Sequence, residues 1–193
     1  MISKLPITLT AASLVMKSIV YIGTSLDGFI AKRDNDIEWL VQFQNSEVGR
    51  DFEEFIERVD GIVIGRATFE KVLDFPFWPY TKKVFVLSKT LKEVPDKLQD
   101  KVTILSLAPK ALINYLTKLG HSCIYVDGGK VIQSFLRDDC IDEMIITRVP
   151  LLLGGGIPLF GELDNDLLFR HVQTKVLSNG LVKSYYERSR DDS

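Results

Sequence analysis

Two stretches of the sequence place glycine between a strand-like apolar run and a helix-like segment. In the first, GIVIGRATFEKV, Gly65 would close the strand and residues 66–68 would form the first helical turn. In the second, IYVDGGKVIQSFL, Gly128 and Gly129 would let the backbone approach a ligand closely. Free backbone N–H groups and the helix dipole at such turns attract anions. Each turn alone is ordinary architecture, but two of them in one domain favour a phosphorylated ligand.

Glycine spacing excludes the ordinary dinucleotide-binding motif. Neither turn carries the pattern G-x-G-x-x-G, and residues 154–156 are followed by Ile157 and Pro158, which do not open a helix. Arg66, directly after Gly65, would add a positive charge suited to phosphate. The sequence therefore predicts phosphate binding outside the usual Rossmann arrangement.

Asp51 is the candidate acid. It lies in the segment EVGRDFEEFIERV, whose apolar residues recur at helical spacing. At about 100° per residue, Asp51 lies roughly 40° outside the apolar stripe, beside Phe55. A partly desolvated carboxyl there would have a raised pKa, as a proton donor near neutral pH requires. The alternative is a solvated aspartate in the first turn of the helix.

The segments that would hold these residues alternate between strands and helices. Short runs rich in β-branched residues predict buried strands at residues 19–22, 62–64, 84–87, 102–105 and 124–126. Amphipathic patterns predict helices at residues 47–59, 108–120 and 131–138. Asn179-Gly180 joins two strand-like runs within residues 169–188 and is typical of a hairpin. We therefore expect an α/β domain with a mixed sheet and helices on its two faces.

The overall composition narrows the class of protein. The 193 residues suffice for one domain, which we assign to residues 16–190, with residues 1–15 as a leader or disordered extension. The net charge of −2 gives no reason to expect nucleic acid or a membrane as partner. No apolar run is long enough to span a membrane, so we expect a soluble cytoplasmic protein. With 2 cysteines and 2 histidines, we expect no structural metal.

Five motifs carry a resemblance to a known family. In order they are IGTSLDGFIA, DGIVIGRATFE, VFVLSKT, IYVDGGKVIQSFL and IDEMIITRVPLLLGGGIPLFGE. Together they resemble the dihydrofolate reductase superfamily. They are most similar to stand-alone bacterial proteins like the C-terminal reductase domain of the riboflavin-biosynthesis deaminase-reductase. The resemblance covers roughly residues 17 to 188.

The resemblance implies a fold and an activity. The fold would be dihydrofolate-reductase-like, a three-layer α/β/α domain whose mixed, mostly parallel sheet ends in an antiparallel C-terminal hairpin. The cofactor would be NADPH, and the enzyme would transfer a hydride to a C=N or C=O bond of a small heterocyclic substrate, pterin-like or pyrimidine-like. A homodimer is also expected, because the hairpin leaves a sheet edge that needs covering.

The same resemblance implies roles for individual residues. Those implied to bind the cofactor are Gly23, Ile30, Gly65, Arg66, Ala67, Thr68, Leu87, Ser88, Lys89, Gly128, Gly129, Lys130 and Val131. Among them Arg66, Ser88 and Lys89 would hold the adenosine 2′-phosphate. Those implied to contact the substrate are Asp51, Phe55 and Thr147, with Asp51 as the catalytic acid.

Two departures from the family pattern bear on the substrate. Glu38-Trp39 replaces the Pro-Trp pair of dihydrofolate reductases, which argues against folate. The segment LDFPFWPYTKK lacks the arginine pattern that would bind a ribose phosphate, and its aromatic run is either a cleft wall or loop packing. A different class of function stays open, a catalytically silent NADPH-binding or scaffold protein of the same fold.

Overall fold

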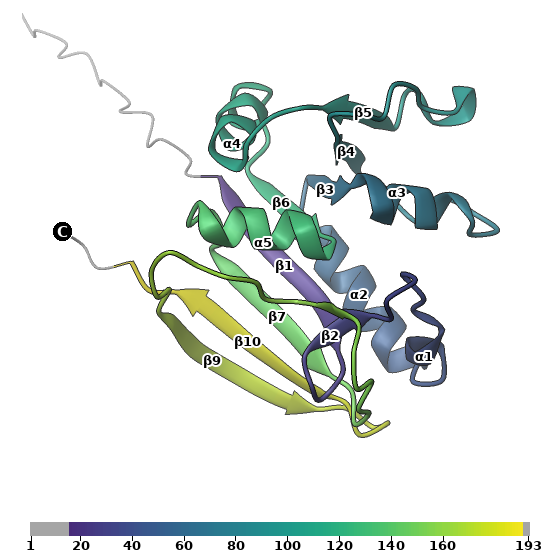
Figure 1. The fold of residues 1–193 in the computed structure, drawn as a ribbon, viewed down its shortest axis with the longest axis vertical. Coiled ribbons are helices and arrows are strands. Elements are labelled where there is room, and N and C mark those ends of the chain that lie inside the picture. Colours follow the sequence, from purple (N-terminus) through teal and green to yellow (C-terminus); the bar gives the residue numbers. More distant parts are fainter. Residues whose placement is uncertain (1–15, 191–193) are drawn as a thin grey trace, which may run out of the picture.

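The computed structural model describes residues 16–190, which are organised around one sheet (Figure 1). Its strands are β1 (Lys17–Thr24), β3 (Gly61–Gly65), β4 (Lys83–Leu87), β5 (Val102–Leu105), β6 (Cys123–Asp127), β7 (Glu143–Arg148), β9 (Phe169–Val176) and β10 (Val182–Arg188). They form an 8-stranded sheet in the order β5-β4-β3-β6-β1-β7-β10-β9. The strands from β5 to β7 run parallel, and β10 is antiparallel to both β7 and β9. The predicted mixed, mostly parallel sheet is confirmed.

The parallel strands are apolar because helices cover both of their faces. Ile62, Val63 and Ile64 of β3 are fully buried although successive side chains point to opposite faces. The apolar runs that predicted strands lie within β1, β3, β4, β5 and β6. Because both faces of these strands are buried, their sequences are continuous β-branched runs, and these runs allowed the strands to be predicted from the sequence.

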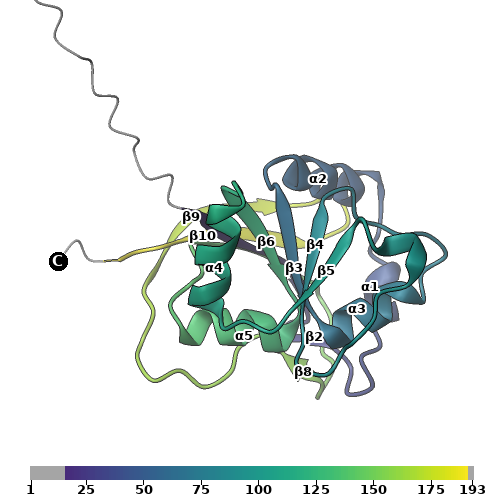
Figure 2. The ribbon, with the colours of Figure 1, turned by 90° about the horizontal axis from the view of Figure 1, so that it is seen from above.

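Helices pack on the two sides of the sheet (Figure 2). They are α2 (Ser46–Glu57), α3 (Arg66–Leu73), α4 (Pro109–Lys118) and α5 (Gly129–Arg137). Phe55 of α2 and Phe69 of α3 belong to the apolar core on one face. Leu112 of α4 and Phe135 of α5 belong to the core on the other face. The three-layer α/β/α arrangement expected from the sequence is therefore present.

Short elements escaped the sequence patterns. They are a helix α1 (Glu38–Val41), a 3₁₀ helix η1 (Asp96–Leu98), and the strands β2 (Phe29–Ala31) and β8 (Ile157–Pro158), which pair with each other. The β2–β8 contact depends on Gly156, because a Cβ there would lie 2.2 Å from the carbonyl oxygen of Ala31. Elements of two to four residues are too short to show a period.

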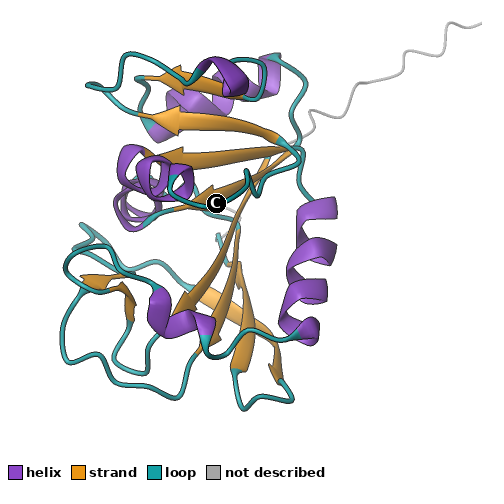
Figure 3. Cartoon of the chain, turned by 90° about the vertical axis from the view of Figure 1, so that its right-hand side faces the viewer, coloured by secondary structure: helices purple, strands orange, loops and turns teal. Residues whose placement is uncertain are grey.

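The sheet is strongly twisted (Figure 3), and its C-terminal hairpin of β9 and β10 lies at one edge (Figure 1). The hairpin strands β9 and β10 are joined through Asn179-Gly180, where Gly180 has a φ of +80°. A positive φ favours glycine, which explains the Asn-Gly pair. The predicted hairpin is confirmed.

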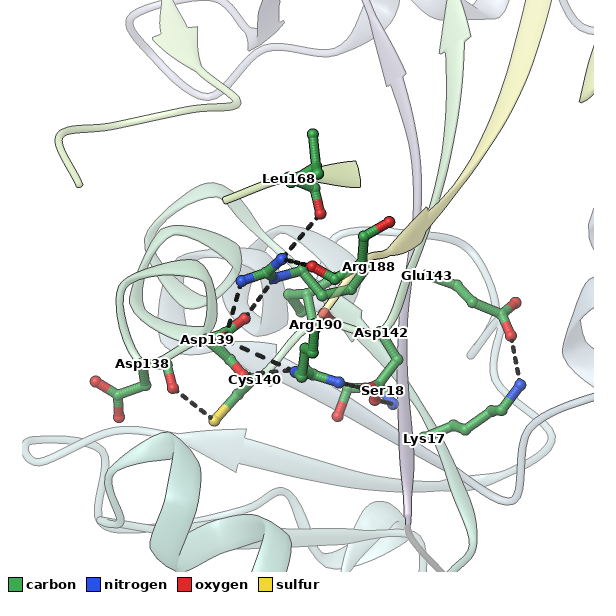
Figure 4. A network of polar contacts seen from close by, with 12 residues as sticks. Lys17, Ser18, Asp138, Asp139, Cys140, Asp142, Glu143, Leu168, Arg188 and Arg190 are labelled. Carbon is green, nitrogen blue, oxygen red and sulfur yellow. Dashed lines mark hydrogen bonds and ion pairs between the residues drawn. The ribbon is translucent and has the colours of Figure 1, made fainter. Parts of the chain in front are cut away.

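Ion pairs fasten the end of β10 to the turn before β7 (Figure 4). Arg188 Nε lies 2.7 Å from Asp139 Oδ1, and Arg190 Nη1 lies 2.6 Å from Asp142 Oδ1. The other oxygen of Asp142 accepts the backbone N–H of Ser18 at 2.8 Å. These contacts join β1, β7 and β10 at the ends of these strands that lie away from the glycine turns.

Within residues 16–190, no helix is long and apolar enough to cross a membrane. The predicted leader, residues 1–15, lies outside the described part of the chain.

Candidate active site

A cavity of about 1190 Å³ opens at the carboxyl ends of β1, β3, β4 and β6. The strand order explains its position. The chain passes from β3 outward to β4 and β5, then returns to place β6 between β3 and β1. Such a reversal in strand order leaves a crevice beyond the strand ends, where α/β proteins bind ligands.

The first glycine turn forms one wall of this cavity. Gly65 is the N-cap of α3, and no side chain caps that helix. The first backbone N–H groups of a helix have no partner within it, so they are available to an anion. Arg66 is the first residue of α3, and its side chain is about half exposed.

The second glycine turn packs against the first. Gly128 is the N-cap of α5, with a φ of +92° and no side-chain cap. A Cβ at Gly128 would lie 2.4 Å from Thr68 Oγ1, and one at Gly65 would lie 3.1 Å from Val131 Cγ2. The two turns therefore pack too closely for a side chain at either glycine, and this brings both helix N-termini to the same cavity, where their free N–H groups could bind a pyrophosphate.

The charges around the cavity favour an anionic ligand. Its basic wall residues are Arg66, Lys71, Lys89 and Lys130, and its single wall carboxylate is Asp127. Arg66 donates to Thr90 Oγ1 at 3.1 Å, and Ser88 Oγ accepts the backbone N–H groups of Thr90 and Leu91. These hydroxyl and guanidinium groups gather where β4 ends.

Aromatic side chains from β1, β6, α2 and the segment between α3 and β4 line another part of the cavity, which we call the aromatic end. Its wall includes Tyr21, Phe52, Phe75, Tyr80 and Tyr125. The Tyr21 ring stacks on Phe55 at 4.6 Å between centroids, and Phe52 meets Tyr21 edge-on at 5.6 Å. Burial raises the pKa of the Tyr80 hydroxyl above its usual range, so that the group stays protonated and neutral. This end suits a flat, uncharged ring.

Comparisons with known proteins identify the family of this chain. The family model described as RibD C-terminal domain matches residues 78–183. The protein YwjB of Bacillus subtilis (strain 168) is 38% identical over 178 residues, which are 90% of this chain and 98% of that protein. The chain belongs to the RibD C-terminal domain family.

Solved structures extend the same comparison. A protein from Shewanella sp. PV-4, named for riboflavin biosynthesis, is 46% identical with a TM-score of 0.86, covering 91% of this chain and 100% of that one. Dihydrofolate reductase from Enterococcus faecalis, solved with NADP(H), has a TM-score of 0.63 at 18% identity, covering 92% of this chain and 98% of that one. The latter likeness shows the fold alone. The predicted dihydrofolate-reductase-like reductase fold is confirmed.

In this RibD C-terminal domain, every residue predicted to bind the cofactor borders the cavity. They are Gly23, Ile30, Gly65, Arg66, Ala67, Thr68, Leu87, Ser88, Lys89, Gly128, Gly129, Lys130 and Val131. The fold brings them from five separate stretches of chain to one place because each stretch lies at the cavity side of β1, β2, β3, β4 or β6. Their contact with a cofactor stays a prediction.

The residues predicted to contact the substrate lie behind the cavity wall. Asp51, Phe55 and Thr147 do not line the cavity. Thr147 on β7 pairs in register with Gly23 on one side and with Lys183 on the other, and it is buried. Phe55 supports Tyr21 from behind. These residues therefore lie behind the side chains that line the cavity, and their contact with a substrate stays a prediction.

The expected opening of Asp51 onto the cleft needs correction. Its Oδ2 lies 2.5 Å from Nζ of Lys183, and its side chain is 20% exposed. The carboxyl is therefore neither a solvated first-turn aspartate nor a free acid in the cavity. The physical reason is the lysine of β10, which reaches across the sheet face and holds the carboxyl by a charge-assisted hydrogen bond.

The aromatic run FPFWPY divides between both interpretations left open by the sequence. Phe75 and Tyr80 line the cavity, whereas Phe77 is 71% exposed. Trp78 packs edge-on against Phe69 at 6.2 Å and against Tyr80 at 5.3 Å. Part of the run is thus cavity wall and part is loop packing.

Asp127 is a cavity residue that the sequence analysis missed. Burial raises the pKa of Asp127 to about 6, although the Gly128 N–H and the Tyr125 side chain favour its charged form. Its Oδ1 accepts the Gly128 N–H at 2.7 Å. An acidic residue directly before a Gly-Gly turn at a strand end was the signal that could have revealed it.

Proposed function

We propose that this RibD C-terminal domain is an NADPH-dependent reductase that adds a hydride to a C=N or C=O bond of a small, flat, pterin-like or pyrimidine-like heterocycle. One observation carries the proposal. The two uncapped helix N-termini at Gly65 and Gly128 meet at one cavity, whose wall also carries basic side chains and aromatic rings.

The chain's own residues divide the work along the cavity. The turns at Gly65 and Gly128 would hold the pyrophosphate, with Lys130 beside them. Arg66, Ser88 and Lys89 would hold the 2′-phosphate by charge-assisted hydrogen bonds, which favours NADPH over NADH. Gly23 and Ile30 would flank the nicotinamide ring. When bound, the cofactor would supply the hydride, and the protein would orient the substrate against it.

Asp51 is a positioning residue in this proposal, because it acts through Lys183 rather than by touching the substrate. Phe55 and Thr147 would shape the substrate end from behind Tyr21 and Gly23. Asp127, at the junction of the two ends, would exchange hydrogen bonds with ring nitrogens of the substrate.

Gly128 offers a test with a matched control. Gly128→Ala pushes a methyl group against Thr68 of the other turn and strains a backbone φ of +92°, whereas Gly120→Ala strains a φ of +90° with open space around its Cβ. Both variants should lose about 1–2 kcal/mol of stability from the left-handed conformation. Only Gly128→Ala should also lose NADPH affinity, by a factor on the order of 10 or more.

Two measurements decide the matter. NADPH binding followed by cofactor fluorescence should show the difference between the two glycine variants. NADPH oxidation against pterins, flavin precursors, pyrimidines and quinones should then reveal turnover with one class. Binding without turnover would favour the silent binding protein instead, and equal NADPH affinity in both glycine variants would remove the proposed pyrophosphate site.

A cytoplasmic location and a homodimer complete the proposal. Support for the dimer comes from β9, a sheet-edge strand that is exposed along nearly its whole length. Sedimentation equilibrium of the purified protein would test it, and a monomer at all concentrations would reject it.

A further inference from the structure

Lys183 is a charged residue in an unusual place. Among residues 16–190 it is the one lysine, arginine, aspartate or glutamate that is buried, with 1% of its surface exposed. A lysine is almost never buried this fully unless its ammonium group is paired. Its Nζ has two partners, Asp51 Oδ2 at 2.5 Å and the Tyr21 hydroxyl oxygen at 2.8 Å.

The three residues come from separate elements and meet on the sheet face that α2 covers. Tyr21 lies on β1, Asp51 on α2 and Lys183 on β10. Tyr21 belongs to the cavity wall, and the Asp51 side chain is 20% exposed to solvent. The hydrogen-bonded series Asp51–Lys183–Tyr21 therefore runs from solvent at α2 to the aromatic end of the cavity.

The hydrogen-bond inventory fixes the direction of the contact with Tyr21. An ammonium group has three donors and no acceptor, so Lys183 must donate and the Tyr21 oxygen must accept. The hydroxyl hydrogen of Tyr21 is then left to point away from Lys183. Within the described residues that hydroxyl has no other hydrogen-bond partner, so its proton is available to a ligand in the cavity.

We propose, on the basis of the reductase function above, that Tyr21 donates the proton that accompanies hydride transfer and that Lys183 replaces it. As the substrate carbon takes up the hydride, its nitrogen or oxygen takes the proton of the Tyr21 hydroxyl. The Tyr21 oxygen then takes a proton from Nζ of Lys183. A solvent proton entering beside Asp51 returns Lys183 to its ammonium form.

Each part of the network has a stated task. Burial and the Asp51 carboxylate raise the pKa of Tyr21, so its hydroxyl is protonated when a substrate binds but is a weak acid that needs help to release the proton. The ammonium group beside the Tyr21 oxygen stabilises the charge that develops there. Asp51 fixes the position of Lys183, so Asp51 and Lys183 are positioning residues and Tyr21 is the group that touches the substrate.

Variants at these positions separate the relay from a structural ion pair. Tyr21→Phe removes one hydroxyl and leaves the pair intact, and Lys183→Met removes the ammonium group. Each should lower turnover by a factor on the order of 100 while NADPH affinity stays unchanged. Lys175→Met is the control, because Lys175 lies opposite Lys183 in the β10–β9 register but is exposed on β9.

Lys183→Arg provides the sharper distinction. Arginine keeps the positive charge and the pairing with Asp51, but it does not give up a proton in proteins. A structural role predicts that Lys183→Arg restores turnover lost in Lys183→Met. The relay predicts that Lys183→Arg stays as slow as Lys183→Met, with a thermal melting curve close to that of the wild type.

A second measurement is independent of turnover. In protein labelled with ¹⁵N-lysine, the Lys183 side chain should give an exchange-protected ammonium signal at neutral pH, which Tyr21→Phe shifts and Lys175→Met leaves in place. A neutral amine at Lys183 would overturn the relay whatever the activity. Wild-type turnover in Tyr21→Phe or in Lys183→Arg would overturn the relay alone. A wild-type protein that oxidises NADPH with none of the acceptors would overturn the proposed function and the relay together.

Discussion

The two ends of the cavity are built in different ways. The end with the glycine turns is made from backbone N–H groups at two helix N-termini, together with exposed basic side chains close in sequence to those turns. The aromatic end is made from side chains, and behind its wall Tyr21, Asp51 and Lys183 meet from β1, α2 and β10. One end would bind its ligand through backbone N–H groups. The other would bind through side chains that neighbouring side chains hold in position.

This difference predicts how each end responds to mutation. Substitutions other than proline leave the backbone N–H groups in place, so such changes at the turn end act by filling space or by removing a peripheral charge. At the aromatic end, a single side chain can transfer a proton, or it can hold in position the side chain that transfers the proton. Losses at the aromatic end should therefore appear in turnover, and losses at the turn end in cofactor affinity.

Asp51→Asn should give the largest effect and tests the aromatic end. The substitution keeps the size of the side chain but removes the charge that holds Lys183 at 2.5 Å. Turnover should fall by a factor on the order of 100 or more with NADPH affinity unchanged. Steady-state kinetics and cofactor titration measure the two quantities.

Glu53→Gln, an exposed position on the same helix, is the control for Asp51→Asn and should leave both quantities unchanged. A loss of NADPH affinity in Asp51→Asn would show that the two ends are not separate. Undiminished turnover would reject any role of Asp51 in the reaction.

Asp127→Asn tests the point where the two ends meet. The pKa of Asp127 is raised from 3.8 to about 6, so the folded protein holds a proton there over a range in which the unfolded chain has released it. The carboxyl therefore favours folding most below about pH 4, and that contribution is lost as the pH rises through about 6. Asparagine has no such titration and can still accept the Gly128 N–H.

The stability of Asp127→Asn relative to the wild type should therefore rise between about pH 4 and pH 7 and then level off, by on the order of 2 kcal/mol in total. Urea unfolding at a series of pH values measures this difference. Asp164→Asn, at an exposed carboxyl, is the control. A difference that does not change with pH would mean that the cavity leaves Asp127 fully solvated.

The contrast between the two ends also explains what the sequence could predict. Gly65 and Gly128 were readable because a strand end, a glycine and a helix start are consecutive in the chain, and the resemblance to a known family then supplied Ser88 and Lys89. The sheet was readable for a similar reason, since burial on both faces leaves long β-branched runs. Local patterns and family motifs thus predicted the fold and the wall of the turn end.

Lys183 could not be predicted in the same way. Its neighbours in the sequence, Val182 and Ser184, give it the pattern of an exposed position in a hairpin strand. The strand order of the sheet places β10 next to β7, on the face that α2 covers. There the Lys183 side chain reaches Asp51, and no local sequence pattern indicates this contact. The helical wheel placed Asp51 at the edge of the apolar stripe correctly, but it could not supply the partner that turns the carboxyl away from the cavity.

Arg66→Ala should give the smallest effect and tests the turn end at its open rim. The Arg66 side chain is about half exposed, lies 3.5 Å from Glu70 and donates to Thr90 Oγ1, so it is a peripheral charge rather than part of the core. A dianionic 2′-phosphate would draw the guanidinium away from Glu70, because a phosphate accepts a bidentate pair of hydrogen bonds from arginine. Solvent screening limits the gain at such an exposed position to about 1.4 kcal/mol, or a factor of about 10 in affinity.

We therefore expect Arg66→Ala to weaken NADPH binding about tenfold and to leave NADH binding unchanged, with turnover at saturating NADPH also unchanged. Parallel titrations with the two cofactors measure this, and Arg137→Ala, an exposed arginine at the other end of α5, should change neither affinity. Equal losses of affinity for NADPH and NADH would place Arg66 at the pyrophosphate instead. A fall in turnover at saturating NADPH would show that the cavity is not divided into a cofactor-binding end and a proton-transfer end.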